Sequence, residues 1–384
     1  LLDQLCQRLM RRGLRLLRVV IGMPTLHPLI VIRSMTWQRG RGVKETLRDH
    51  AVFESSVYLD SPVALSHQGA AAVRRRLDRP ETVLDFPILR DLRAAGATDY
   101  LALPLRFTRG RPSYVSWTTD APGGFAPAEL RLLDDLMPLV AVRFEIEARR
   151  AMMDDILATY LGADAARKVV AGAVRRGGGE LVRAAIWYCD LRGFTRLADQ
   201  APPAATIALL DDYFDCVAAP VQERGGEVLK FIGDAMLAIF RCDAAGEDAA
   251  CALALEAAID ALKRLHVLNQ GRALEGAPAL DIGIALHLGD VMYGNVGASN
   301  RLDFTVIGAA VNLVTRLESR CAVLGRPLLA TAEFAARCAG GSMLSLGPHR
   351  LRGVRQPIEL FAAAAVVAQA PAPALRKVRR SARR

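Results

Sequence analysis

The sequence contains no long apolar run and no paired-cysteine motif. No stretch reaches the roughly 18 uninterrupted apolar residues that a membrane-spanning helix needs. The seven cysteines are scattered, odd in number and without CxxC spacing, so a zinc or redox site of that type is not indicated. The opening residues lack the pattern of a secretory signal. These absences favour reduced, mostly buried thiols, and we expect a cytoplasmic protein.

The composition is that of a folded protein with more than one core. A chain of 384 residues has room for two ordinary domains, and 52% of its residues are hydrophobic. The net charge is +10, but six positive charges lie in a C-terminal tail over 367–384: Arg376, Lys377, Arg379, Arg380, Arg383 and Arg384. A solvated, disordered tail is the ordinary interpretation, with attraction to an anionic membrane surface or RNA as the alternative. We expect no specific nucleic-acid partner.

Residues 1–145 mix short apolar runs with turn signals, which predicts an α+β domain. Its clearest part is a strand over 100–105, a Gly/Pro hairpin over 109–112 and a second strand over 113–117, followed by a helix. This order resembles the closing part of GAF sensor domains. The resemblance implies a regulatory domain that responds to an unknown small-molecule or protein signal.

A long helix is predicted to begin near Ala128 and to continue, either unbroken or with one break, through a helical linker over 146–180, stopping at Gly177. Its apolar stripe has the 4-3-4 spacing of a helix that packs on a partner: Leu133, Met137, Val140 and Phe144. Two interpretations stay open. The stripe covers the N-terminal core, or it pairs two chains in a signalling helix.

From Leu181 the pattern changes to short strands that alternate with amphipathic helices. The expected elements are a strand over 184–189, a helix over 207–221, a hairpin over 228–231 and 236–240, a helix over 247–268 and a strand over 282–286. The succession strand, helix, hairpin, helix, strand is the split ferredoxin-like pattern. We therefore predict a ferredoxin-like α+β domain over 181–366.

Two aspartates stand at turns of this predicted sheet. Asp190 ends the first strand and leads into a glycine-containing loop before a helix, a place that suits a metal ion beside a phosphate. Asp234 lies in the hairpin turn. Since we expect the first and second strands to be neighbours, both carboxylates can converge on one site. Taken alone, each aspartate is also typical of a turn or a helix cap.

In context, the motifs resemble those of the class III adenylate and guanylate cyclases. Residues 190–195 (DLRGFT) are similar to the family's first metal motif, and residues 226–234 (GEVLKFIGD) to its second. Residues 303–318 match the third motif in order and spacing, and 289–297 resemble a glycine-rich strand connection. The resemblance covers about residues 181–366 and implies the palm-type fold of that family.

The resemblance implies a role for each matched residue. The metal set is Asp190, Leu191 and Asp234, and it would hold two divalent ions, Mg²⁺ or Mn²⁺. The substrate-binding set is Lys230 and Thr305 for the base, with Gly193, Phe194, Thr195 and Arg352 for the phosphates. The catalytic set is Asn312, which orients the ribose, and Arg316, which stabilises charge at the α-phosphate.

The implied reaction is the conversion of ATP to cyclic AMP and pyrophosphate. Lys230 favours ATP because a lysine can donate to an adenine ring nitrogen, whereas guanylate cyclases carry an acidic residue there. Thr305 stands where many adenylate cyclases have aspartate, which weakens the inference about selectivity. The family pattern also implies a head-to-tail homodimer with two shared sites. A guanylate cyclase and an inactive dimerising or nucleotide-sensing module are the alternatives; a diguanylate cyclase is disfavoured because its Gly-Gly-Asp/Glu-Glu-Phe turn is missing.

Overall fold

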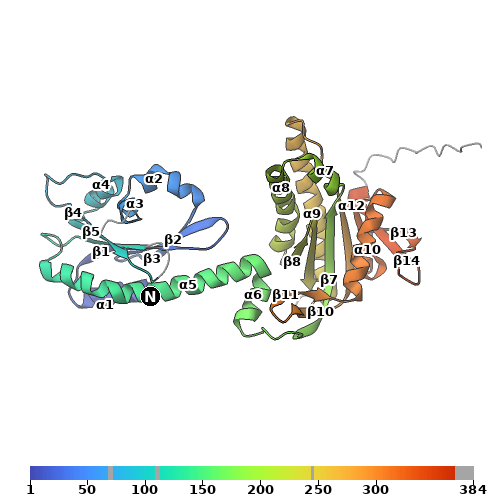
Figure 1. Cartoon of the computed structure of the whole chain (residues 1–384), viewed down its shortest axis with the longest axis horizontal. Helices are drawn as coiled ribbons and strands as arrows, with labels where there is room; N and C mark the ends of the chain where they lie inside the picture. Colours follow the sequence, from blue (N-terminus) through green and yellow to red (C-terminus); the bar gives the residue numbers. More distant parts are fainter. Residues whose placement is uncertain (68–71, 109–112, 244–245, 368–384) are drawn as a thin grey trace, which may run out of the picture. The chain divides into compact units, whose positions relative to one another are not determined.

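The computed structural model describes residues 1–67, 72–108, 113–243 and 246–367 (Figure 1). The predicted hairpin turn over 109–112 and the basic tail beyond Val367 fall outside the described residues. The chain divides into two compact units, Leu1–Tyr160 and Leu161–Arg384. In the part of the chain that the structure describes, no helix combines the length and apolarity of a membrane span.

The first unit is built on a six-stranded antiparallel sheet with the order β3-β2-β1-β6-β5-β4. The strands are β1 (Leu16–Pro24), β2 (Ile30–Gln38), β3 (Gly42–Asp49), β4 (Val73–Arg76), β5 (Asp99–Leu105) and β6 (Ser113–Thr119). The helical elements are α1 (Leu2–Arg11), η1 (His50–Glu54), α2 (Ser56–Leu59), α3 (Pro62–His67), α4 (Pro87–Ala94) and α5 (Pro127–Leu161). The two strands predicted over 100–105 and 113–117 are present as β5 and β6. Kinship with GAF domains stays a prediction.

Helix α5 decides between the two interpretations of the apolar stripe. Leu133, Met137, Val140 and Phe144 are buried in one cluster with side chains of α1, β1, β5 and β6. The stripe therefore covers the core of its own unit, and its assignment to the pairing of two chains is wrong. The alternative with a break is confirmed, since α5 ends at Leu161 and Gly162, at φ +87°, separates it from α6 (Ala163–Val170). That backbone conformation suits glycine and interrupts the helix. The expected stop at Gly177 is wrong, because α6 ends at Val170.

The second unit contains an eight-stranded sheet with the order β13-β14-β12-β10-β7-β9-β8, and β11 pairs with β10. The strands are β7 (Gly179–Leu191), β8 (Glu227–Ile232), β9 (Ala235–Arg241), β10 (Ile282–Ala298), β11 (Arg301–Ile307), β12 (Leu328–Thr331), β13 (Met343–His349) and β14 (Ile358–Ala363). The helices are α7 (Phe194–Gln200), α8 (Pro203–Glu223), α9 (Gly246–Leu274), α10 (Ala309–Leu324), α11 (Ala332–Ala335) and α12 (Ala364–Val367). The succession β7, α8, β8, β9, α9, β10 is the predicted one, in a mixed α+β fold.

Helices cover both faces of this sheet, as Figure 1 shows for α8 and α9 on one side and α10 on the other. Successive residues of a strand point to opposite faces. Trp187 and Cys189 of β7 accordingly pack in a cluster with α8 and α9, whereas Ala184 and Ile186 pack in a second cluster with α10. Strand β7 is buried on both faces, which explains its nearly continuous apolar sequence.

The glycine-rich segment 289–297 is part of a strand. We expected a strand to end near Leu286 and a connection to follow, but β10 continues to Ala298 and pairs with β7 from Ile282 to Gly294. Gly294 lies opposite Gly179 in this pairing, and a Cβ on Gly294 would come within 2.3 Å of the Gly178 carbonyl oxygen. The glycine therefore permits a close approach of two backbones.

Candidate active site

Asp190 and Asp234 lie together at one end of the central sheet. Asp190 is near the end of β7 and pairs in register with Ala235 of β9, the residue that follows Asp234. Gly233 has φ +65°, so this turn uses the conformational freedom of glycine. The two carboxyl groups converge as predicted, but the pair of neighbouring strands that brings them together differs from the predicted pair. Strand β7 pairs with β9, the third strand of the motif. Strand β8, the second strand, pairs with the other side of β9 at the edge of the sheet.

The two carboxyl groups disturb each other electrostatically. The pKa of Asp190 is raised to about 6, first by burial and then by the charge of Asp234 and a hydrogen bond between the two side chains. A hydrogen bond to the backbone of Leu191 opposes this rise. Two carboxylates held this close repel each other in their ionised forms. Their arrangement therefore favours a bound proton or a bound cation.

A third carboxyl group, Glu318 of α10, faces the same region. Its side chain is buried, and its pKa is raised to about 7 by burial first and then by Asp190, while Arg192 opposes the shift. A Cβ on Gly283, which pairs with Asp190, would lie 2.1 Å from Glu318 Oε1. Gly283 thus leaves the space that the glutamate occupies. Glu318 stands at the end of the third motif, and no role was predicted for it from the sequence.

The aspartate pair fits the metal ions that the family implies. Hard carboxylate oxygens are the ligands that Mg²⁺ and Mn²⁺ accept, and a cation would relieve the repulsion that raises the pKa of Asp190. The side chain of Leu191 is buried, so that residue could offer only its backbone oxygen. Over the described ranges, no set of three or more His, Cys, Asp or Glu side chains has the arrangement of a metal site. One chain would therefore supply only a few ligands to a bound metal ion.

The loop after Asp190 combines one anchored and two accessible residues. Gly193, at φ +72°, precedes α7. Phe194 is partly buried and packs against the core between the sheet and helices α8 and α9. Gly193 and Thr195 are exposed. The phenylalanine thus fixes the loop in place, while its neighbours remain accessible to a ligand.

Lys230 meets an acidic residue that the sequence analysis did not single out. Lys230 lies on β8, and its ammonium group donates to the carboxylate of Asp303 on β11. Thr305 lies two residues further along β11 and pairs in register with Gly294. A two-residue separation places Asp303 and Thr305 on one face of the strand. That separation was the signal available in the sequence.

Asn312 and Arg316 occupy the exposed face of α10. The opposite face, with Val314, Leu317 and Cys321, is buried against the sheet. A separation of four residues places Asn312 and Arg316 one turn apart on the same side. Arg316 Nη1 donates to the carbonyl oxygen of Gly353 at 3.4 Å.

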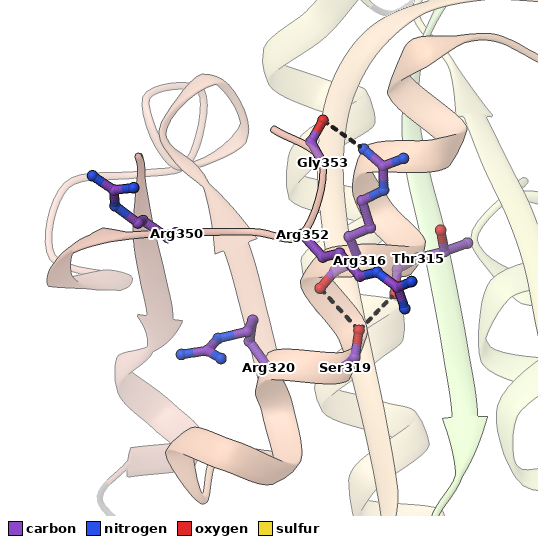
Figure 2. Close-up of a pocket in the computed structure, with 7 residues that line it drawn as sticks. All are labelled: Thr315, Arg316, Ser319, Arg320, Arg350, Arg352 and Gly353. Carbon is purple, nitrogen blue, oxygen red and sulfur yellow. Dashed lines mark hydrogen bonds between the residues drawn. The ribbon is translucent and has the colours of Figure 1, made fainter. Parts of the chain in front are cut away.

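Arg316 belongs to a groove of about 660 Å³ lined by α10 and the segment 350–353, shown in Figure 2. The lining residues, called here the arginine groove, are Thr315, Arg316, Ser319, Arg320, Arg350, Arg352 and Gly353. Across the described residues, none of these four arginines forms a salt bridge with a carboxylate of the chain. The groove therefore holds uncompensated positive charge, which suits a phosphate-rich anion. Arg316 and Arg352 were predicted from the sequence motifs, whereas Arg320 and Arg350 were not.

The predicted site residues fall into separate groups within one chain. Asp190 and Asp234 lie near Glu318, Lys230 pairs with Asp303, and Arg316 lies in the arginine groove. As far as the structure describes the chain, no hydrogen bond or ion pair joins the aspartates to Lys230, Asn312 or Arg316. One chain alone does not bring the predicted set together.

Comparisons with known proteins match this unit. Residues 180–328 match the family described as the adenylate and guanylate cyclase catalytic domain. An adenylate cyclase of Anabaena cylindrica is 36% identical over 153 residues, which are 39% of this chain and 29% of that protein. Adenylate cyclase 1 of Rhizobium meliloti is 28% identical over 186 residues, which are 47% and 27% of the two chains. The chain thus spans less than a third of the length of either relative.

A solved structure of a bacterial light-regulated adenylyl cyclase has a similar fold. Its TM-score is 0.51 at 20% identity, and the match covers 69% of this chain and 86% of that one. At this identity the likeness concerns the fold alone. By the family match over residues 180–328, the chain is identified as carrying a catalytic domain of the adenylate and guanylate cyclase family.

Proposed function

We propose that the protein is an adenylate cyclase that converts ATP to cyclic AMP and pyrophosphate. The observation that carries the proposal is the facing pair of Asp190 and Asp234 at the end of the central sheet, inside the matched catalytic domain. The two carboxylates repel each other, and a turn with a purely structural role does not need such a repelling pair. The names of the two bacterial relatives support the same activity.

In this proposal each group of residues has a separate task. Asp190 and Asp234 hold the divalent ions, which when bound would make the ribose 3′-hydroxyl more acidic and neutralise the phosphates. The loop with Gly193 and Thr195 and the side chain of Arg352 receive the phosphates. Asn312 orients the ribose, and Arg316 stabilises the charge that grows at the α-phosphate. Positioning and electrostatic stabilisation carry the catalysis, and no side-chain base is needed.

Uncompensated charge in the arginine groove supports binding of a triphosphate. Arg320 Nε is buried without a hydrogen-bond partner, so a donor is available at the inner wall. Guanidinium groups bind phosphate oxygens in a bidentate manner. We infer that Arg320 and Arg350 extend the predicted contacts of Arg352 toward the leaving pyrophosphate.

Two copies of the chain would complete the site. The acidic pair and the arginine groove are each uncompensated within one chain, and a head-to-tail homodimer would bring opposite charges together. Helix α5 offers a further surface for pairing. Its exposed apolar side chains recur every seven residues, the period of a coiled-coil seam: Leu132, Leu139, Ile146, Met153 and Tyr160. This seam differs from the buried stripe that the sequence suggested.

The N-terminal unit would regulate the catalytic domain. We propose a sensor over 1–145, a helical linker over 146–180 and a cyclase domain over 181–366. Support comes from α5, which belongs to the core of the first unit through Phe144 and continues to Leu161, where the second unit begins. A change in the sensor core could thus reach the linker through one continuous helix.

A turnover assay with the full chain tests the proposed function. With Mn²⁺ or Mg²⁺, we expect cyclic AMP from ATP and a kcat/KM for ATP at least about tenfold above that for GTP. Asp234→Ala should lower kcat at least about 100-fold because a metal ligand is removed. A preference for GTP would identify a guanylate cyclase. No cyclic nucleotide from either substrate would favour the inactive module.

A further inference from the structure

The pair of Lys230 and Asp303 joins two strands that are distant in sequence. Both side chains are partly exposed, at 41% and 46% of their full accessible surface. The hydrogen bond from Lys230 is the largest influence on the pKa of Asp303 and lowers it, so the carboxylate is ionised at neutral pH. An ionised carboxylate only accepts hydrogen bonds, and an ammonium only donates them. The pair therefore presents one acceptor beside one donor.

The position of Asp303 sets it apart from an ordinary surface partner. Along β11, Phe304 and Val306 are buried, whereas Asp303 and Thr305 face the other way. Successive residues on one face of a strand are about 7 Å apart, within the span of a purine ring system and its substituents. The carboxylate that the resemblance places at position 305 in many adenylate cyclases is thus supplied here two residues earlier on the same face.

We propose that Asp303 is a specificity-determining residue of the base site, which positions the Lys230 ammonium group and presents an acceptor to the exocyclic amine of adenine. This inference rests on the proposed function. The Watson–Crick edge of adenine has an acceptor at N1 and a donor at N6, which match Lys230 and Asp303. Guanine in the same pose presents a donor at N1 and an acceptor at O6, so both contacts become repulsive.

Fixing Lys230 has a physical benefit for recognition. A lysine side chain has four rotatable carbon–carbon bonds, and ordering it on binding costs free energy. Asp303 orders it before the nucleotide arrives and leaves further N–H donors for the base. An exposed ion pair of this kind adds little to folding stability, so its loss should not unfold the protein.

The test is Asp303→Asn in the full chain, with steady-state kinetics on ATP and GTP. We expect KM for ATP to rise about tenfold, kcat to change less than about threefold, and the ratio of kcat/KM for ATP over GTP to fall about tenfold. Asp303→Glu should restore part of the ratio because it keeps the carboxylate. Asp243→Asn is the matched control, since Asp243 forms a similar exposed pair with Arg241, and it should leave both parameters unchanged.

Equilibrium binding separates this inference from the proposed function. Calorimetric titration with non-cyclisable ATP and GTP analogues should show a preference of the wild type for ATP that Asp303→Asn loses. If the wild type produces no cyclic nucleotide but shows this binding difference, the proposed activity fails and the inference stands. If Asp303→Asn keeps the wild-type KM and the wild-type ATP preference in turnover and binding, the inference is wrong while the activity stands. A loss confined to kcat would also contradict it.

Discussion

The two units of the chain each hold an aspartate at least partly away from solvent, and the two aspartates have opposite surroundings. In the first unit, the fully buried Asp99 accepts hydrogen bonds from Arg74 Nη2 at 2.6 Å and from the backbone nitrogen of Phe125 at 3.1 Å. In the second unit, the side chain of Asp190 faces the carboxyl group of Asp234, and the one backbone hydrogen bond at Leu191 does not offset this repulsion. Matched charges stabilise a fold, whereas unmatched charges are tolerated where a ligand or partner supplies the counterpart.

The same contrast appears in the direction of the pKa shifts. Glu145 of α5 accepts hydrogen bonds from the side chain and backbone of Thr108 and from Arg149, and its pKa is lowered to about 2. Glu318 is buried near Asp190, and its pKa is raised to about 7. Asp190 and Glu318 of the second unit thus carry poorly satisfied charge, and both belong to the proposed active site.

The largest expected effect is the loss of catalysis when an unmatched carboxylate is neutralised. Asp190→Asn should lower kcat at least about 100-fold, because the amide is a poor ligand for a divalent ion. The thermal midpoint of the metal-free protein should stay constant or rise, since the repulsion with Asp234 is removed. A turnover assay and a thermal scan in EDTA measure the two effects. A variant that is active, or one that is unfolded, would contradict this account of the pair.

Neutralising the matched carboxylate should have the opposite outcome. Asp99→Asn weakens the pair with Arg74, which is partly exposed, and we expect the first unit to lose about 2 kcal/mol of its free energy of unfolding. Amide hydrogen exchange resolves this, because protection should fall in β5 and β6 and stay constant in β7 and β9. Unchanged protection in β5 would show that the buried pair is not stabilising.

Overfilling the space beside Glu318 should have a smaller effect on stability. Gly283→Ala places a methyl group on the carboxylate, and we expect a loss of about 1 kcal/mol together with lower kcat, because the nearest atom is the end of a side chain that can shift. Gly271→Ala in α9 is the control, because no atom lies within 4 Å of its added Cβ; it should raise stability by up to about 1 kcal/mol. Denaturant titration of both variants measures the difference. Equal stability in the two would rule out a tight contact at Gly283.

The smallest expected effect is a pH dependence of opposite sign in the two units. The folded-state pKa of Glu318 is above the ordinary glutamate value of 4.5, so its stabilising contribution is present below pH 4.5 and is lost as the pH rises through about 7. For Glu145 the folded-state pKa is below that value, so its contribution is present above pH 4.5 and is lost as the pH falls toward 2. Thermal scans of metal-free Glu318→Gln should show a flatter profile between pH 4.5 and 7 than the wild type. Glu145→Gln should leave that window unchanged.

The sequence predicted features that depend on local periodicity. The apolar run of β7 and the amphipathic repeat of α8 determine strand and helix by themselves. The stripe from Leu133 to Phe144 was ambiguous because a helix shows the same spacing whether it covers its own sheet or a second chain. The position of the break at Gly162 could not be predicted because an isolated glycine also occurs inside helices.

Within the site, the residues that lead a motif were predictable and their partners were not. Asp190 and Asp234 stand at a strand end and a turn, where sequence signals are strong. The approach of Glu318 depends on how α10 packs against β10, and that of Asp303 on how β11 lies beside β8. Such contacts join distant parts of the chain, so the spacing in β11 shows that Asp303 shares a face with Thr305 but not that it meets Lys230.

A complementation assay tests most directly whether a second copy supplies the missing charge. Asp234→Ala removes a metal ligand, and Arg316→Ala removes a residue of the arginine groove, so each variant alone should be nearly inactive. When the two variants are coexpressed, half of the dimers are mixed and each mixed dimer has one intact site, which predicts about one quarter of the wild-type specific activity. Coexpressed variants that remain as inactive as each variant alone would contradict a site shared between two chains.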